Sequence, residues 1–445
     1  MPAFARRFVA RLQASPTGSR LAHGAFWSLA GAIISRGSMF VAGIFLARIL
    51  GREGFGKLGM IQSTLDMFGI FAGFSMGMTA TKFVAEFRTR DPLRAGRIIV
   101  LVCLATIIAD IAVCSLLFVF APHLVVRFFR TPELNGLLRI GIASVFLSAV
   151  NGTLTGVLAG FEAFRTIAKV NLCAGVFTLP LILTGVLWRG LEGTVWALNT
   201  GQLVLCVFNL LALRDVCRNE RIQWDGSSVT SEWRLVLHFS LPALLSSIPL
   251  APVAFVCNAL LISQPGGYSQ MGILNAANLW FSLMLFIPSI SNQALLPILA
   301  ERAKSTAEED DVPAHKIMRA AMRVTAWAAV PLTVCICLLS PIIMGLYGSG
   351  FAGGWKTLCF AAVAACIVAL QLPASTMLIA ARSMWLACLT TVFWGSTYYG
   401  LSRMWVAHGS DGISLARTVA YAVNFALTLL LLNIRFFKHS NYGAR

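Results

Sequence analysis

Three ionisable side chains interrupt long apolar stretches of the sequence: Arg36, Asp66 and Asp110. A charge near the middle of a membrane-spanning helix costs at least about 2.5–3.5 kcal/mol, so such residues usually face a bundle interior and find partners. The planar guanidinium group of Arg36 suits a phosphate or carboxylate group. Asp66 or Asp110 could then bind a coupling proton or cation. A structural ion pair between Arg36 and one of these carboxylates is the alternative, and for Asp110 the structural role is favoured.

Amide side chains also recur at helical spacing within the apolar stretches. Asn275, Asn278 and Asn292 share one face of a helix predicted over residues 271–295, and Asn151 shares a face with two serines. Helix packing explains such faces when their residues are small, but an unpartnered amide in hydrocarbon is costly. We therefore predict that Arg36, Asn151, Asn275, Asn278 and Asn292 line a water-filled, substrate-binding cavity. Two further stripes are Gln62, Asp66, Gly69, Gly73 and Gly77, and Asn199, Gln202, Cys206 and Asn209.

The composition places these residues in an integral membrane protein. The chain has 445 residues, of which 58% are hydrophobic and 12% charged, and its mean hydropathy is +0.78. An average soluble domain carries about 25% charged residues. The net charge of +17 does not indicate nucleic acid, because the basic residues flank apolar runs and there suit an anionic cytoplasmic leaflet.

The apolar runs predict an all-α protein with twelve transmembrane helices, each of roughly 20 residues or more. The predicted spans are 25–48, 58–80, 98–121, 137–158, 168–188, 193–213, 236–260, 271–295, 320–345, 356–380, 385–404 and 413–434. If both termini are cytoplasmic, the inner connections hold 24 Lys and Arg residues and the outer ones 10. Arg417 belongs to the outer set in this count. The bias predicts that the N- and C-termini both lie inside.

The sequence also predicts two halves of six helices each. The expected organisation is a basic cytoplasmic tail at 1–23, a first bundle at 24–213, a cytoplasmic linker at 214–234, a second bundle at 235–434 and a cytoplasmic tail at 435–445. The turn from Gly54 to Gly59 matches the turn from Gly267 to Gly272, 213 residues later. Six is an even number, so the two repeats are expected to be parallel, as in transporters with a central cleft.

Motifs for chemistry on a cofactor are not found in the sequence. It has no phosphate-binding glycine loop with its lysine, no metal-ligand set and no catalytic triad. The 11 cysteines resemble small apolar residues, and only Cys217 is expected in a polar loop. We therefore predict a protein that is not an enzyme and has neither cofactor nor metal. A membrane glycosyltransferase would need acidic clusters on loops beside the membrane, but the outer loops are short and nearly free of acids.

Several segments resemble one known family. They are residues 47–56 (ARILGREGFG), 81–86 (TKFVAE), 91–96 (DPLRAG) and 158–164 (LAGFEAF). These segments resemble polysaccharide transporters, the Wzx-type oligosaccharide flippases, of the multidrug/oligosaccharidyl-lipid/polysaccharide flippase superfamily. The resemblance is clearest over about the first 175 residues. It implies a V-shaped bundle of twelve helices that works by alternating access in the bacterial inner membrane.

The resemblance also implies a substrate and partners. Family members move undecaprenyl-diphosphate-linked oligosaccharides for O-antigen, capsule or exopolysaccharide assembly, and a polysaccharide polymerase with its chain-length machinery is a candidate partner. Arg36 is the candidate for the cavity cation. The second half has almost no cation within a span, which argues against a strongly anionic glycan. A multidrug or organic-cation exporter remains one alternative, and a non-transporting membrane enzyme or assembly partner of polysaccharide synthesis remains another.

Overall fold

The computed structural model describes residues 16–73, 76–220, 222, 233, 240, 250–302, 314–380 and 384–434. Within these ranges the regular structure is helical, and the helices divide between two compact units. Unit 1 comprises residues 1–42, 65–123 and 135–245, and unit 2 comprises residues 43–64, 124–134 and 246–445. Residues 1–15 of the predicted N-terminal tail, the predicted C-terminal tail and most of the predicted linker lie outside the described residues, whereas residues 16–23 of the first tail form the start of the first helix.

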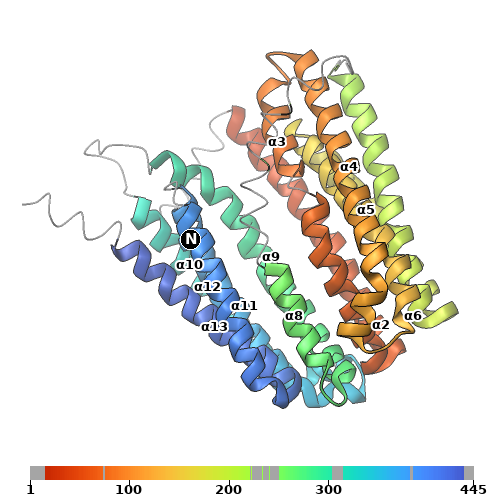
Figure 1. The fold of residues 1–445 in the computed structure, drawn as a ribbon. Coiled ribbons are helices and arrows are strands. Elements are labelled where there is room, and N and C mark those ends of the chain that lie inside the picture. The colour runs from red at the N-terminus through yellow and green to blue at the C-terminus, as the bar shows by residue number, and fades with distance from the viewer. Residues whose placement is uncertain are drawn as a thin grey trace, which may run out of the picture. The chain divides into compact units, whose positions relative to one another are not determined.

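The helices of unit 1 are α2 to α6, which lie side by side in Figure 1. They span Pro16–Gly73 (α2, whose residues 43–64 belong to unit 2), Met76–Phe87 (α3), Pro92–Leu124 (α4), Leu134–Gly160 (α5) and Phe164–Asn219 (α6). Two of them are broken: α2 at Gly51, with φ 67°, and α6 at Arg189 and Gly190, with φ 56° at Gly190. Glycine adopts positive φ at little cost, so each break can join two shorter helices.

Unit 2 contains α8 to α13 and three short helical segments. Its elements are η1 (Val125–Phe129), α8 (Leu250–Ile262), α9 (Gly267–Arg302), α10 (Ala314–Leu346), η3 (Ser349–Gly354), α11 (Trp355–Ala380), α12 (Met384–Trp405), η4 (Val406–His408) and α13 (Gly409–Leu432). Helix α11 packs against α9, α10 and α13. Its buried face is rich in alanine, including Ala361, Ala362 and Ala364, and such small side chains allow close helix packing.

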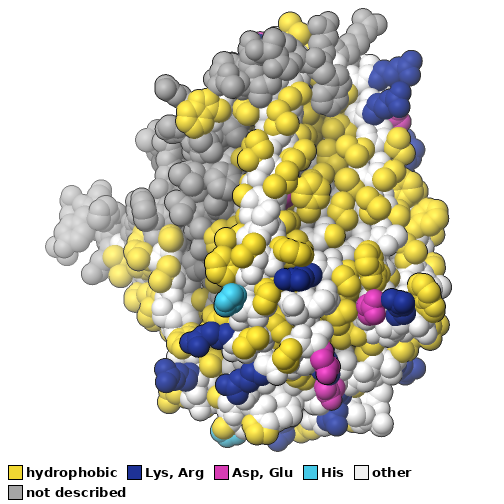
Figure 2. Space-filling view, turned by 45° about the vertical axis from the view of Figure 1, so that its right-hand side comes forward, with side chains coloured by type: hydrophobic (Ala, Val, Ile, Leu, Met, Phe, Trp, Pro, Cys, Tyr) yellow, Lys and Arg dark blue, Asp and Glu magenta, His cyan; other side chains and the backbone are white. Residues whose placement is uncertain are grey.

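Within the described ranges, eight helical segments are long and apolar enough to cross a membrane. Three of them have 52, 56 and 45 residues, more than twice the roughly 20 residues that one crossing needs. Large apolar side chains such as Trp188 and Trp327 are 82% and 83% exposed, and the face in Figure 2 is mainly hydrophobic with few charged side chains. Such a surface suits lipid rather than water. The chain is therefore a multi-pass membrane protein, as its composition predicted.

Several predicted spans match a single helix or helix arm, whereas the span predicted at 58–80 begins in α2 and ends in α3, and α2 begins nine residues before the span predicted at 25–48. The span predicted at 356–380 matches α11, and those at 168–188 and 193–213 match the two arms of α6. Helix α6 continues to Asn219, beyond the predicted start of the linker at 214. Cys217 is consequently not in a polar loop but buried, with 2% of its surface exposed. Most of the span predicted at 236–260 falls outside the described residues.

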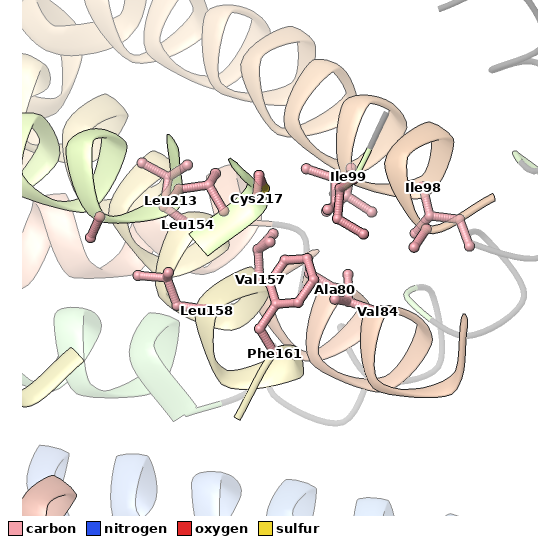
Figure 3. Close-up of a cluster of buried hydrophobic side chains, with 14 of the residues drawn as sticks. Ala80, Val84, Ile98, Ile99, Leu154, Val157, Leu158, Phe161, Leu213 and Cys217 are labelled. Atoms are coloured by element: carbon pink, nitrogen blue, oxygen red, sulfur yellow. The ribbon is translucent and has the colours of Figure 1, made fainter. Parts of the chain in front are cut away.

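The core of unit 1 joins α3, α4, α5 and α6. Figure 3 shows Val84, Ile99, Val157 and Leu213 pointing into one cluster, in which Cys217 also lies. Helix α3 approaches α5 through glycines: a methyl group added at Gly156 would overlap the carbonyl oxygen of Gly77. Gly77 belonged to a predicted polar stripe, and here it serves helix packing.

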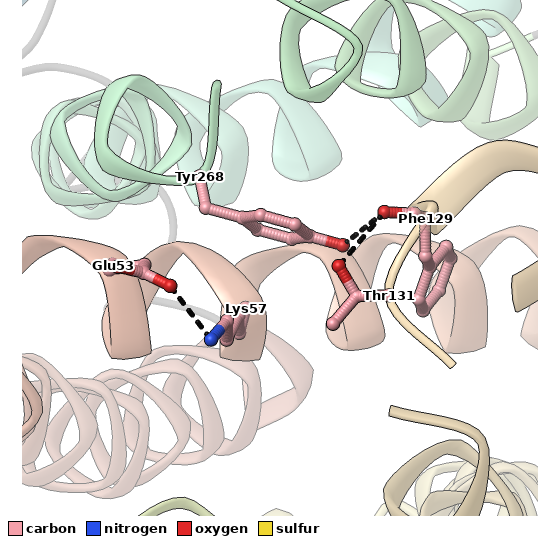
Figure 4. Close-up of polar contacts among 5 residues, drawn as sticks. All are labelled: Glu53, Lys57, Phe129, Thr131 and Tyr268. Atoms are coloured by element: carbon pink, nitrogen blue, oxygen red, sulfur yellow. Dashed lines mark hydrogen bonds and ion pairs between the residues drawn. The ribbon is translucent and has the colours of Figure 1, made fainter. Parts of the chain in front are cut away.

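In unit 2 the hairpin at Gly51 lies against the start of α9. The hydroxyl of Tyr268 donates to the carbonyl oxygen of Phe129 over 2.8 Å, and Lys57 pairs with Glu53 at 2.8 Å while its amine lies 5.9 Å from the Tyr268 ring centroid (Figure 4). A methyl group added at Gly56 would overlap the backbone of Tyr268. This glycine therefore sets how closely the two segments approach.

Candidate functional site: a buried arginine in unit 2

A guanidinium group lies inside unit 2 between α9 and α13. Nη1 of Arg417 donates to Oδ1 of Asn278 over 2.6 Å, and its Cζ lies 4.6 Å from the ring centroid of Phe281. Asn278 and Phe281 are three residues apart on α9, so they share a helix face. Arg417 lies eight residues after the first residue of α13, about 12 Å along the axis. The cation is therefore held well inside the helix.

Aromatic rings extend from this cation across three helices. Phe281 stacks on Tyr421 with centroids 6.2 Å apart, and Tyr421 stacks on Trp394 at 5.0 Å. Tyr421 follows Arg417 by one helical turn, whereas Trp394 comes from α12 and is itself in contact with Tyr398 at 5.5 Å. Aromatic faces attract cations, and the attraction strengthens away from water. The rings thus stabilise the guanidinium group but do not neutralise it.

The electrostatics of Arg417 are unbalanced. Its Nε and Nη2 atoms are buried and have no hydrogen-bond partner among the described residues. Arg417 also forms no ion pair with any residue that the structure describes. Nε and Nη2 form one edge of the guanidinium fork, the geometry that binds carboxylate or phosphate with two parallel hydrogen bonds. The site therefore offers two parallel N–H donors, not used within the described residues, that could bind one anion in a bidentate manner.

Asn278 is the one predicted cavity residue that contacts this cation. The other two amides on α9 make different contacts: Nδ2 of Asn275 lies 3.5 Å from the carbonyl oxygen of Phe55, and Oδ1 of Asn292 accepts from the Thr376 hydroxyl at 2.9 Å. These bonds join α9 to other elements of unit 2. The three amides thus share a helix face but have separate partners.

In unit 1 the predicted residue Asn151 is 5% exposed and lies in an amide network. Its Nδ2 donates to Oε1 and to the backbone oxygen of Gln202, at 3.1 and 3.0 Å, and its Oδ1 accepts from Asn209 at 3.0 Å. Asn199 similarly donates to the carbonyl oxygen of Ile140 at 2.8 Å. These bonds join α5 to the second arm of α6, so most of this stripe serves helix packing.

The three charges first noted in the sequence differ in burial. Arg36 is exposed on the first arm of α2, and Asp66 is exposed near the end of the same helix. Asp110 on α4 is fully buried, and neither carboxylate oxygen has a hydrogen-bond partner in the part of the chain that the structure describes. Of the alternative that Arg36 pairs with one of the two carboxylates, the pairing with Asp110 is therefore not formed. One helical turn to either side of Asp110, Thr106 bonds to Thr153 and Cys114 contacts the backbone of Ile142, which places Asp110 at the face between α4 and α5.

Sequence reasoning missed Arg417 because the charge count assigned it to an outer connection. The predicted last span began only four residues earlier, and charges near a span end normally reach the interface. The structure begins α13 at Gly409, which brings Arg417 inside the helix and corrects the statement that the second half lacks such a cation. The signal in the sequence was Tyr421, which follows Arg417 at the spacing of one helical turn.

Comparison with known proteins identifies the family. A family model described as polysaccharide biosynthesis protein matches residues 21–302. The chain belongs to this polysaccharide biosynthesis family. The EPS I polysaccharide export inner membrane protein EpsE of Ralstonia nicotianae is 24% identical over 406 residues, covering 88% of this chain and 89% of that protein. The lipid III flippase of Escherichia coli K12 is 25% identical over 323 residues, covering 71% and 74%.

Solved structures share the fold of this polysaccharide biosynthesis family member. An inward-facing multidrug resistance MATE family transporter of the MOP superfamily has a TM-score of 0.75 at 16% identity, covering 92% of this chain and 98% of that one. The lipid II flippase MurJ, in an inward closed conformation, has a TM-score of 0.71 at 13% identity, covering 92% and 87%. The family model confirms the predicted resemblance to a polysaccharide family, and the solved structures show that the chain shares their fold.

Proposed function

We propose that the protein moves undecaprenyl-diphosphate-linked oligosaccharide, such as an O-antigen, capsule or exopolysaccharide repeat unit, from the cytoplasmic to the outer leaflet by alternating access. The observation that carries this proposal is the Arg417 guanidinium, a buried cation with two unused donors and no acidic partner among the described residues. A charge held at such cost inside a membrane bundle is expected to be functional. A diphosphate supplies the negative charge and the paired oxygens that this edge accepts.

The two unused donors are covered in the present structure. A diphosphate therefore reaches them only after the covering side chains move, as expected for a carrier that binds in one state and releases in another. In this proposal Asn278 holds the other side of the guanidinium group in both states. Arg36 is exposed on α2. In this proposal it contacts the anionic headgroup first, before the diphosphate reaches Arg417.

The proposed topology has twelve crossings in two parallel repeats, with both termini inside and the protein in the bacterial inner membrane. Two contacts in unit 2 support the repeat. Phe55 of the first hairpin contacts Phe351 of η3 edge-on at 6.4 Å, and Tyr268 of the matching hairpin bonds to Phe129 of η1. The hairpin residues differ by 213 positions and the short-helix residues by 222. A polysaccharide polymerase and its chain-length machinery are proposed as partners.

The competing proposal is a multidrug or organic-cation exporter. Asp110 is the observation that favours it, because a buried, unpartnered carboxylate can bind a cation or a proton. Arg417 opposes it, because a substrate cation near an uncompensated guanidinium group is repelled. We assign Asp110 to coupling-ion binding under either proposal, and Asp66 remains the second candidate.

Reconstitution separates the two proposals. Purified protein in liposomes is given a fluorescent polyprenyl-diphosphate oligosaccharide, and the labelled lipid that becomes accessible to an impermeant quencher is measured. A parallel assay follows loss of a cationic dye. The flippase proposal expects lipid movement above that of protein-free liposomes and no dye transport. Dye transport without lipid movement would establish the exporter, and movement of neither would support the non-transporting assembly partner.

A further inference from the structure

A cavity with a partly polar wall lies within unit 1. It has a volume of about 280 Å³ and lies between the first arm of α2 and the two arms of α6. Its polar lining comes from Ser38, Asn171, Thr178 and Gln202. At about 30 Å³ per water molecule, the volume equals roughly nine waters, comparable to a single pyranose ring with its hydroxyl groups. The cavity therefore has the size of one sugar residue.

The hydrogen-bonding groups of this cavity are largely unused. Neither the Asn171 amide nor the Ser38 hydroxyl has a hydrogen bond to any other described residue. The Thr178 hydroxyl donates to the carbonyl oxygen of Ala174 at 2.7 Å, so its lone pairs remain free to accept. Gln202 accepts from Asn151 through Oε1, which fixes the amide and leaves its Nε2 hydrogens as donors. The cavity thus offers both donors and acceptors.

The character of these groups restricts the ligand. Among the described residues that line the cavity there is no Lys, Arg, Asp or Glu, so a phosphate or an organic cation would lose its hydration without gaining a counter-charge from them. Apolar side chains, including Leu179 and Ile182, form the rest of the wall. A neutral sugar matches both parts, because its hydroxyl groups donate and accept while its C–H face is apolar. Ordered water alone would fill the polar side but leave the apolar wall without a partner.

We propose that the cavity formed by Ser38, Asn171, Thr178 and Gln202 binds one neutral sugar residue of the transported glycan. This inference rests on the proposed flippase function, since it assigns the glycan to unit 1 and the diphosphate to Arg417 in unit 2. The neutral part of the substrate and its anionic part would then have separate binding residues. Asn171 lies on α6 and Arg417 on α13, so each site can be altered by mutation without changing the other.

The test compares two lipids in the same liposomes: a polyprenyl diphosphate bearing a neutral oligosaccharide, and the bare polyprenyl diphosphate. Asn171→Leu removes the amide while keeping the branching of the side chain at Cγ. It is expected to slow movement of the glycosylated lipid about tenfold and leave the bare lipid unaffected. The matched control is Cys173→Leu, two residues away on α6 and exposed, which is expected to change neither rate.

Equal slowing of both lipids, or of neither, by Asn171→Leu would overturn the sugar site while leaving the flippase proposal intact. If wild-type protein moves neither lipid, the flippase proposal fails and the site is judged by direct binding. Saturation-transfer NMR with methyl glycosides of glucose, galactose and N-acetylglucosamine then compares wild-type protein with Asn171→Leu. Loss of a wild-type signal in the variant supports the site. Absence of any wild-type signal, or equal signals in both proteins, rejects it.

Discussion

Arg417 and Asn278 meet through a 2.6 Å hydrogen bond between α13 and α9, and this bond occupies only one of the three guanidinium nitrogens. The bond fixes the direction of the fork without cancelling its charge. A purely structural arginine at this depth would be expected to have an acid beside it, since an unpaired charge inside a bundle is costly. The contact is therefore best explained as the support of a binding group.

Replacing Arg417 by lysine should reduce lipid movement markedly even though the charge is kept. An ammonium group is a point charge and cannot make two parallel hydrogen bonds to one phosphate. We expect a loss of at least tenfold, which corresponds to about 1.4 kcal/mol, and a larger loss for Arg417→Gln. The measurement is the initial rate of quencher-accessible lipid. Arg403→Ala, on the exposed end of α12, is the control, and equal activity of Arg417→Gln and wild type would remove the anion-binding role.

Removing both partners of this bond should not destabilise the fold. In the double variant Arg417→Met, Asn278→Leu, the burial cost of the charge disappears and no polar partner is left unsatisfied, a change that is often neutral or stabilising. We expect an equal or higher melting temperature in detergent together with loss of lipid movement. A clear fall in melting temperature would indicate that the pair holds the bundle together and that lost transport follows from lost structure.

Adding a methyl group where α3 and α5 cross should show whether the glycines there serve helix packing or line an open cavity. Gly156→Ala places a methyl group on the carbonyl oxygen of Gly77, whereas Gly152→Ala, one turn earlier on α5, meets no neighbour. Overpacking at a helix contact typically destabilises a protein by about 1–3 kcal/mol. At a helix position without close neighbours, replacing glycine by alanine stabilises the helix by about 1 kcal/mol. Thermal unfolding followed by circular dichroism should show a lower melting temperature for the first variant only. Similar curves would mean that α3 and α5 separate readily.

The helices of this protein could be predicted because apolar length alone determines them in a membrane. The site could be predicted only in part. Asn278 was found because an amide in hydrocarbon needs a partner, but that partner, Arg417, lies 139 residues away and is brought near by the packing of α9 on α13. Such packing leaves no periodic trace in the sequence.

Glycine and amide stripes were ambiguous for a related reason. The spacing that places Asn151 on one helix face is the same whether that face meets water or another helix. The structure resolves the ambiguity through Gln202 and Asn209, which satisfy its amide from α6. Gln202, in turn, was recognised only as a member of a stripe, because the cavity it lines is formed by α2 and both arms of α6.

The buried carboxyl group of Asp110 should be the site where an ion gradient acts on transport. Neither of its oxygens has a hydrogen-bond partner in the structure, so Asp110→Asn exchanges an ionisable group for a neutral one of the same shape without breaking a bond. We expect this variant to fold normally and to move lipid at a rate that no longer changes when a proton or sodium gradient is imposed across the liposome. Asp66→Asn, at an exposed position of α2, should keep the response of the wild type. If the pattern is reversed, coupling belongs to Asp66, and if wild-type transport ignores every gradient, Asp110 has no coupling role.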